Sequence, residues 1–312
     1  MRINNTVVAV PTFGNFLFTK LTIEHIIKTT KKVDYTLFVV VGDKNDKNTI
    51  KYCKRNSIDY VVHDINKGLP GSINDIYDYA FKDNSFDSVT IVGNDVLAFW
   101  NSIDQLIDEA NSTDYDWISG VAVPINVLIK AVPECKKYFH GGEKDKNFNG
   151  TSLPEWLDKF KFTEKENRIL DLKRHSIVGD SHNMCVFTKK VFDVVGYVDV
   201  NCYPAYFEDN DYSRRAQLLG IKMCRVANAR YFHFWSRTIH QGPDGASDNK
   251  FFDNTKDFYK EKWGDLPGKE VYKVPFNGRA YSYNNVKAKG HLNIASRKRE
   301  IMIINYWKSK HG

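Results

Sequence analysis

Hydrophobic and polar positions in the first 125 residues alternate between two periods. Short apolar runs rich in β-branched residues indicate buried strands, at residues 6–10, 35–41, 59–65 and 88–93. Stretches with helical spacing lie between these runs, at residues 15–30, about 46–56 and 72–82. Asn45 or Asp46 is the predicted N-cap of the second helix, and Ser72 that of the third. This alternation predicts a mainly parallel sheet with helices on both faces.

The pattern resumes after a polar interval. Residues 125–180 are irregular and rich in lysine, and loops of this length are commonly functional. The remaining predicted elements are a strand and helix at 182–196, a helix that ends at Gly220, and a strand at 221–234. Past Pro243 the chain changes character again. We therefore expect a main domain of residues 1–240 and a C-terminal extension of residues 241–312.

The composition is that of a globular protein with one large core. The chain has 312 residues, of which 42% are hydrophobic. Its apolar runs are far shorter than the ~20 residues of a membrane span, and no signal-peptide pattern is present, so we expect a cytoplasmic protein. The five cysteines form no C-x-x-C pair and are odd in number, which argues against a zinc site or a disulfide framework.

Positive charge is concentrated at the C-terminal end. The whole chain carries a net charge of +7, and residues 286–312 hold seven lysines and arginines against Glu300, a balance of +6. Tyr306, Trp307 and the apolar run IMII are interleaved with these charges. Such a segment could contact phosphates, an anionic lipid surface or only water.

Polar turns follow the four predicted strands, at the edge where parallel sheets bind their ligands. Neither a G-x-G-x-x-G nor a P-loop sequence occurs at the first turn, which argues against the common dinucleotide and P-loop classes. Asp95 comes directly after the fourth strand, where a carboxylate can hold a divalent cation that bridges a diphosphate. His233 is a second candidate ligand, although a lone histidine among aromatic residues more often packs or forms a hydrogen bond.

An acidic cluster opens the helix that ends at Gly220. Glu208, Asp209 and Asp211 fall within four residues, just before two arginines. Carboxylates at a helix N-terminus cap free N–H groups and favour the helix dipole, and Asp211 can pair with the arginines three and four residues on. A cap and an ion pair account for two of the three acids. The third makes chemistry an alternative to a purely structural cluster.

The order of these features resembles a known enzyme family. The series "VAVPTFGN", "VVVGDKND", "NKGLPGSIN", "TIVGNDV", "CVFTKKVFDVVGYVD", "YFEDNDYSRRA" and "ARYFHF" resembles the family 2 glycosyltransferases, in particular their rhamnosyltransferase-like branch. The resemblance covers about residues 5–240. It implies an α/β GT-A fold, Rossmann-like, with a mainly parallel central sheet flanked by helices and a C-terminal extension. Residues 258–277 give a weaker match to glycosyltransferases encoded in bacteriophage genomes.

The resemblance also implies roles for particular residues. The implied nucleotide-sugar-binding positions are Pro11, Thr12, Phe13, Asp43, Asn66, Gly68, Asn74 and Asn94. Asn94 and Asp95 occupy the Asp-x-Asp region of the family, so Asp95 is the single acidic ligand for Mn²⁺ or Mg²⁺, and His233 would complete the pair. Ile73 stands where the family often has an arginine, so one contact to the donor is missing.

By the same resemblance, the chain is an inverting, metal-dependent glycosyltransferase that uses a nucleotide sugar, expected to be a UDP-sugar. Asp209 matches the base that deprotonates the acceptor hydroxyl, and Glu208 would hold the acceptor or orient the base. The acceptor could be a hydroxymethylated base of phage DNA, modified in the host cytoplasm, and the basic tail fits a polyanion. A polysaccharide, a lipid-linked glycan, or a catalytically silent sugar- or nucleotide-binding module are the alternatives.

Overall fold

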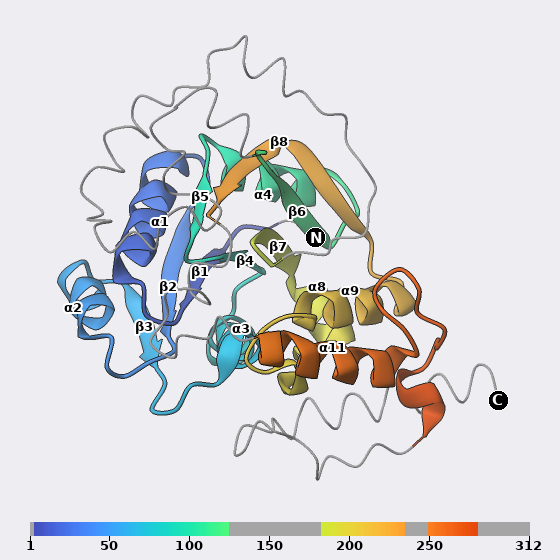
Figure 1. Cartoon of the computed structure of the whole chain (residues 1–312). Helices are drawn as coiled ribbons and strands as arrows, with labels where there is room; N and C mark the ends of the chain where they lie inside the picture. Colours follow the sequence, from blue (N-terminus) through green and yellow to red (C-terminus); the bar gives the residue numbers. More distant parts are fainter. Residues whose placement is uncertain (1–2, 125–181, 235–248, 280–312) are drawn as a thin grey trace.

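The computed structural model describes residues 3–124, 182–234 and 249–279 (Figure 1). Within them, eight strands form one sheet in the order β3-β2-β1-β4-β7-β6-β8-β5. The strands are β1 (Thr6–Thr12), β2 (Tyr35–Val41), β3 (Asp59–Val62), β4 (Ser88–Val92), β5 (Val96–Ala98), β6 (Trp117–Ala122), β7 (Met184–Thr188) and β8 (Met223–His233). Neighbours from β3 to β4 pair in parallel, as do β6 and β8, whereas β7 and β5 run antiparallel to their neighbours.

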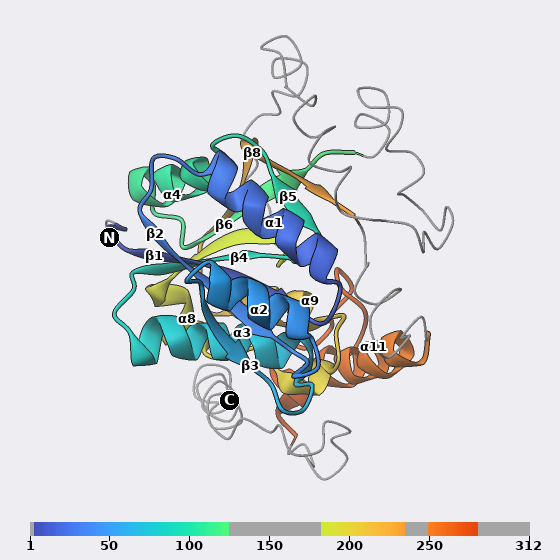
Figure 2. The ribbon, with the colours of Figure 1, turned by 90° about the vertical axis from the view of Figure 1, so that its left-hand side faces the viewer.

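Helices cover both faces of this sheet. They are α1 (Phe16–Thr29), α2 (Lys47–Arg55), α3 (Gly68–Asp78), α4 (Ser102–Ser112), α8 (Lys189–Val195), α9 (Glu208–Leu218) and α11 (Asn249–Trp263). Short helical turns are η1 (Tyr79–Asp83), η3 (Val200–Cys202) and η4 (Pro275–Gly278). Figure 2 shows α1 and α4 on one side of the sheet and α3 and α8 on the other.

The core is divided into two layers by the sheet. Val8 and Val10 of β1 pack toward α1 and α4, while Val7 and Ala9 pack toward α3, α8 and α9. All four side chains are fully buried, because helices cover both faces. This burial explains why the strands are continuous apolar runs instead of alternating sequences. The expected α/β fold with a mainly parallel sheet is confirmed.

The N-terminal signals of two helices had different outcomes. Asp46 caps α2, since its carboxylate accepts bonds from the backbone N–H and the hydroxyl of Thr49, at 3.0 and 2.6 Å. The prediction that Ser72 caps the third helix is wrong, because α3 begins at Gly68. The Ser72 hydroxyl donates a 3.0 Å bond to the carbonyl of Gly68 one turn earlier, so it lies inside the helix.

Strand β7 brings a later part of the chain to the ligand edge of the sheet. It runs antiparallel to β4 and places Met184 opposite Val92, the last residue of β4. The N–H of Gly93 donates a 2.8 Å bond to the carbonyl of Asn183. Residues just before β7 therefore lie beside the turn that carries Asp95.

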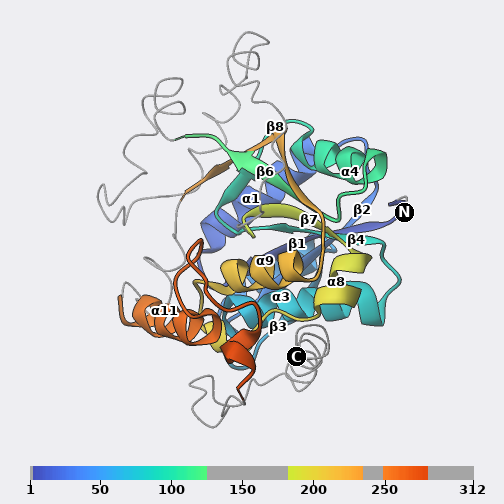
Figure 3. The same cartoon turned by 90° about the vertical axis from the view of Figure 1, so that its right-hand side faces the viewer.

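No helix of the described residues is long and apolar enough to span a membrane. The polar interval predicted at 125–180 and the basic segment at 286–312 lie outside the described residues. Helix α11 belongs to the predicted extension, yet it packs beside α9 (Figure 3). The division at residue 240 stays a prediction.

Candidate active site

Two strained residues precede the acids of α9. Tyr206 and Phe207 have φ angles of 77° and 63°, in the left-handed region that bulky side chains rarely adopt. Such residues cost roughly 1–3 kcal/mol each, and they persist where the surrounding structure holds them, commonly at functional sites. Glu208 and Asp209 follow directly as the first residues of α9. The strained turn thus sets the direction in which both carboxyl groups leave the helix.

Glu208 is a buried carboxyl group, 5% exposed. Its Oε2 atom has no hydrogen-bond partner within the described structure. Burial, and after it the negative charge of Asp209, raises the pKa of Glu208 well above its ordinary value. Glu208 therefore keeps its proton to a higher pH than an exposed glutamate. Neighbouring carboxyl groups with separated pKa values can take different chemical roles.

Asp209 is half-buried, and one carboxylate oxygen accepts a 2.8 Å bond from the N–H of Asn210. Burial raises the pKa of the Cys185 thiol, and the charge of Asp209 raises it further. Cys185 lies on β7 and pairs with Ile91 near the end of β4. The charge of Asp209 is thus felt at Cys185, on the strand that pairs with β4.

Asp95 and His233 are brought together by strand pairing. Strands β5 and β8 pair antiparallel with Val96 opposite His233, and the N–H of Phe234 donates a 3.0 Å bond to the Asp95 carbonyl. The Nε2 atom of His233 lies 3.2 Å from Oδ1 of Asp95, and the two side chains are 12% and 9% exposed. The pair proposed from the sequence as metal ligands is adjacent in space.

These two residues fit a divalent cation shared with a substrate. Within residues 3–124, 182–234 and 249–279 there is no group of three or more histidine, cysteine, aspartate or glutamate side chains suited to a metal. A carboxylate oxygen and an imidazole nitrogen suit Mn²⁺ better than Mg²⁺, which prefers oxygen ligands. With two ligands from Asp95 and His233, the other positions would be left to diphosphate oxygens and water.

The predicted donor-binding residues near β1 form a buried hydroxyl cluster. The Nδ2 atom of Asn94 donates to Oγ1 of Thr12 at 3.3 Å, and the Thr12 and Thr19 hydroxyls are 2.8 Å apart. The hydroxyl of Thr22 donates a 2.9 Å bond to the Asn94 carbonyl. These bonds join the end of β1 and helix α1 to the turn that carries Asp95. Pro11 is buried inside β1, and the half-buried Phe13 follows the strand.

Asp43 occupies the turn after β2, next to the end of β1. Its Oδ1 atom accepts a 2.8 Å bond from the N–H of Asn45, and the side chain is half-buried. A Cβ atom at Gly42 would lie 2.8 Å from the Thr12 carbonyl oxygen, too close for any larger residue. The lack of a side chain at Gly42 therefore keeps Asp43 beside the loop that follows β1.

The Asn66 loop contacts the segment that leads to α9. Oδ1 of Asn66 accepts a 2.8 Å bond from the N–H of Gly68, whose φ of +69° favours glycine. A Cβ atom at Gly68 would lie only 2.6 Å from the Pro204 carbonyl, which accepts a 2.8 Å bond from the N–H of Leu69. Asn66 and Gly68 are thus held against the chain four residues before Glu208.

Asn74 makes two backbone bonds instead of facing open space. Its side chain donates to the Val198 carbonyl at 2.9 Å and accepts from the Val198 N–H at 2.8 Å. Ile73, which stands where an arginine is common, is fully buried. A direct contact between Asn74 and a nucleotide sugar stays a prediction. What the structure shows is a link between α3 and the segment before η3.

Lys67 is a cation at this edge that sequence reasoning missed. It lies between Asn66 and Gly68, and its Nζ atom is 2.7 Å from Asp75 Oδ2, where His63 Nε2 also lies at 2.5 Å. Burial alone would raise the pKa of Asp75, but bonds from His63 and Lys67 outweigh it and lower the pKa. The position of Lys67 inside the Asn-x-Gly sequence was the available signal.

His182 is a second residue that the sequence did not single out. It is 6% exposed, stacks on Trp117 with ring centroids 5.7 Å apart, and neither ring nitrogen has a partner within the described structure. Burial, with a smaller contribution from Arg215, lowers its pKa to about 3, so the ring is neutral at physiological pH. It offers an unused donor and acceptor next to Asn183.

Comparison with known proteins bears on the fold. No protein-family profile and no curated protein sequence matches the chain. GalNAc-T7, solved with UDP, GalNAc and Mn²⁺, superposes with a TM-score of 0.54 over 99% of this chain and 58% of its own, at 12% identity. The chain has the GT-A fold. This GT-A chain spans less than two thirds of GalNAc-T7.

Two further solved structures resemble the GT-A chain less closely. The mannosyltransferase PcManGT from Pyrobaculum calidifontis, in complex with GDP-Man and Mn²⁺, has a TM-score of 0.42 at 13% identity, over 73% of this chain and 57% of its own. TarS residues 1–349 from S. aureus have a TM-score of 0.49 at 12% identity, over 82% of this chain and 70% of that one.

Proposed function

We propose that this protein is an inverting, metal-dependent glycosyltransferase that transfers a sugar from a nucleotide sugar, a UDP-sugar, to an acceptor hydroxyl. One observation carries the proposal: the fold brings His233 to within 3.2 Å of Asp95 after β4, and Glu208 and Asp209 form a second pair in the first turn of α9. The first pair suits a cation that holds a diphosphate. The second supplies two carboxyl groups, of which Glu208 has a pKa raised by burial and by the charge of Asp209.

The chain's own residues account for proton transfer. Asp209 takes the proton of the acceptor hydroxyl while that oxygen forms a bond to the anomeric carbon, and the bond from this carbon to the diphosphate oxygen breaks. The nucleoside diphosphate leaves with the bonding electron pair. Glu208, which keeps its proton, donates a hydrogen bond that holds the acceptor or orients Asp209. Asp95 and His233 would hold the cation, which stabilises negative charge on the leaving diphosphate when bound.

The choice of donor and metal is supported by likeness and by ligand chemistry. GalNAc-T7, which has the same fold, was solved with UDP, GalNAc and Mn²⁺. The oxygen and nitrogen donors of Asp95 and His233 agree with Mn²⁺. In this proposal Asp43, in the turn after β2, contacts the base of the nucleotide. Lys67, in the Asn66 loop, adds a cation six residues before Ile73.

The acceptor class is proposed from charge. Residues 286–312 carry +6, which suits DNA that contains hydroxymethylated bases better than a neutral glycan. We therefore place a phage-type DNA acceptor first, and a polysaccharide or a lipid-linked glycan on an anionic membrane second. The basic segment lies outside the described residues, so this part rests on the sequence alone.

The test is release of nucleoside diphosphate from a panel of nucleotide sugars with Mn²⁺, in the presence of hydroxymethylated DNA, unmodified DNA, polysaccharide or lipid-linked glycan. We expect release with a UDP-sugar that requires Mn²⁺ and depends on hydroxymethylated DNA. Tight UDP-sugar binding without release from any acceptor would instead identify a silent binding module. No binding of any nucleotide sugar would overturn the proposal.

The stereochemistry of the product tests the role of Asp209 separately. Direct attack by the acceptor inverts the anomeric configuration, and NMR of the product reads that configuration. A product that retains the donor's configuration would contradict direct displacement with Asp209 as base. In that case a glycosyltransferase of another mechanism would remain.

A further inference from the structure

Helix α11 contacts the chain just before the acids of α9. The ring of Phe252 lies 5.2 Å from that of Tyr206 and 5.3 Å from that of Phe207, between centroids. The ring of Tyr259, about two helical turns after Phe252 on α11, lies 5.5 Å from that of Phe207. Tyr206 and Phe207 are the two residues with positive φ angles that lead into Glu208. Aromatic packing from α11 therefore holds the strained turn.

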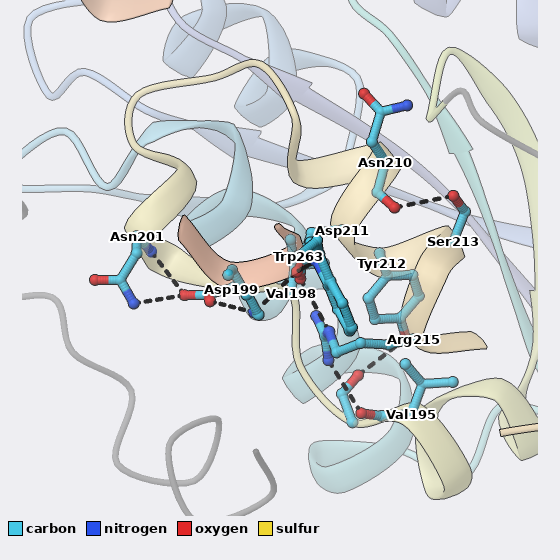
Figure 4. Close-up of polar contacts among 12 residues, drawn as sticks. Val195, Val198, Asp199, Asn201, Asn210, Asp211, Tyr212, Ser213, Arg215 and Trp263 are labelled. Atoms are coloured by element: carbon cyan, nitrogen blue, oxygen red, sulfur yellow. Dashed lines mark hydrogen bonds and ion pairs between the residues drawn. The ribbon is translucent and has the colours of Figure 1, made fainter. Parts of the chain in front are cut away.

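The same helix contacts α9 just after the acids (Figure 4). Nε1 of Trp263 donates a 2.9 Å bond to Oδ1 of Asp211, and Nζ of Lys262 lies 2.8 Å from the same oxygen. The other oxygen of Asp211 accepts a 2.9 Å bond from Nε of Arg215 on α9 itself. Lys262 also lies 2.6 Å from Asp199 in the segment before η3.

These groups form a closed, electrically balanced network. Lys262 is fully buried, and the side chains of Asp199, Asp211 and Arg215 are 3%, 1% and 1% exposed. Two carboxylates face two cations, so no net charge is left in the interior. Removing one partner of such a network leaves an uncompensated buried charge, which strongly destabilises the folded protein relative to the intact network. The position of Asp211 therefore depends on Lys262.

We propose that Lys262 and Trp263 are positioning residues for sugar transfer, and that they act through Asp211 to hold Glu208 and Asp209 in place. This inference rests on the proposed function. The first turn of α9 runs from Glu208 to Asp211, and the N–H of Asp211 bonds to the Phe207 carbonyl at 2.9 Å. A shift of Asp211 therefore moves the turn that carries both acids. Small misplacements of catalytic groups lower rates strongly.

Two substitutions on α11 test the proposal in the full-length chain. Lys262→Met nearly keeps the length of the side chain and removes its charge, while Trp263→Phe removes the indole N–H that bonds to Asp211 and one ring of a fully buried side chain. We expect Lys262→Met to lower kcat by about tenfold to a hundredfold, and Trp263→Phe less, because the acids are displaced. The Kd of the nucleotide sugar, measured by calorimetry, should stay within about twofold, since the bonds that hold Thr12, Asp43 and Asn94 do not involve the network.

Asp104→Asn is the matched control for stability. Asp104 is a fully buried carboxylate that accepts bonds from the N–H groups of Lys31, Lys32 and Val33, at 2.9–3.1 Å, in the layer on the other side of the sheet. Its substitution should lower Tm by breaking a buried polar contact. It should leave kcat within about twofold, because it is remote from α9.

Hydrogen exchange gives a readout that does not depend on activity. Exchange at residues 205–212 should be faster in both α11 variants and unchanged in Asp104→Asn. Wild-type kcat and wild-type exchange in both α11 variants would overturn the proposal. An equal fall in kcat for Asp104→Asn at an equal loss of Tm would overturn it as well.

Trp263→Phe decides the matter if Lys262→Met does not fold, because it keeps Lys262 and therefore leaves no buried carboxylate without a cation. If the wild-type protein transfers no sugar at all, the proposed function fails. The exchange data would then still confirm or overturn the positioning of the Glu208 turn by α11. The two failures are therefore distinguishable.

Discussion

Replacing Glu208 by glutamine tests whether this carboxyl group is protonated in the folded protein. Glutamine has nearly the same shape as the protonated acid, and it carries no charge at any pH. In the folded state, burial and the charge of Asp209 raise the pKa of Glu208 well above the ordinary 4.5. In the unfolded chain both causes disappear. Stability should therefore depend on pH in the wild-type protein in a way that Glu208→Gln does not share.

The sign and size follow from the number of bound protons. Above the unfolded pKa of 4.5 and below the raised folded pKa, the folded state binds one proton at Glu208 and the unfolded state binds none. The free energy of unfolding then falls as pH rises, by about 1.4 kcal/mol per pH unit at most. The contribution of the raised pKa is complete below the unfolded pKa and is lost as pH rises through the folded one.

The assay is urea unfolding, followed by tryptophan fluorescence, of the wild-type protein and Glu208→Gln at about pH 5.5, 6.5 and 7.5. Subtracting the two stabilities at each pH cancels the titration of groups that do not interact with Glu208. We expect the difference to shift in favour of glutamine by about 1 kcal/mol or more per pH unit. When Asp209 is also replaced by asparagine, the folded pKa of Glu208 should be lower, so the pH range over which the difference changes should end at lower pH. A difference that is constant across this range would refute the argument for a protonated Glu208.

Asp209→Asn should lower transfer by about a hundredfold or more while the donor Kd is unchanged, because the base acts on the acceptor. More than about a tenth of the wild-type rate would contradict that role. Asp95→Ala and His233→Ala should each weaken Mn²⁺-dependent UDP binding by about tenfold or more in calorimetry. Equal Mn²⁺ dependence in His233→Ala would return the histidine to a packing role. Asn74→Ala should cost about 2–4 kcal/mol in urea unfolding, because it leaves the N–H and carbonyl of Val198 unpaired inside the protein.

Elements with a strong local signal could be predicted from the sequence. The first strands are continuous β-branched runs because the sheet is covered on both faces, and Asp46 begins α2 by a bond to Thr49. Helix α4 also carries a helical pattern, with Ile103, Leu106 and Ile107 buried on one side, although it lies outside the predicted elements. Strand β5 has only three residues, so its pairing with β8, more than its sequence, defines it.

The candidate site was predictable in its parts but not in its arrangement. Asp95 and His233 could be named as ligands, yet their 3.2 Å separation depends on the register of β5 against β8. Asn74 could be matched to a family position, but its bonds to Val198 join segments far apart in the chain.

Lys262 gave no local signal of burial, because lysine is rarely buried and its two carboxylate partners come from elsewhere in the fold. For this reason the sequence predicted that the residues of helix α11 belong to a C-terminal extension.

The two outer strands of the sheet are also its shortest in the described part of the chain. Strand β3 has four residues and β5 has three, whereas β8, which lies inside the sheet, has eleven. An outer strand exposes unpaired N–H and C=O groups to which a strand of another chain can bind, and the risk of such aggregation grows with the length of the outer strand. The long β-branched runs of β1, β2 and β4 are paired on both sides. The segments most prone to amyloid-like pairing are therefore shielded in the folded state, and association between copies through β2 would require β3 to detach first.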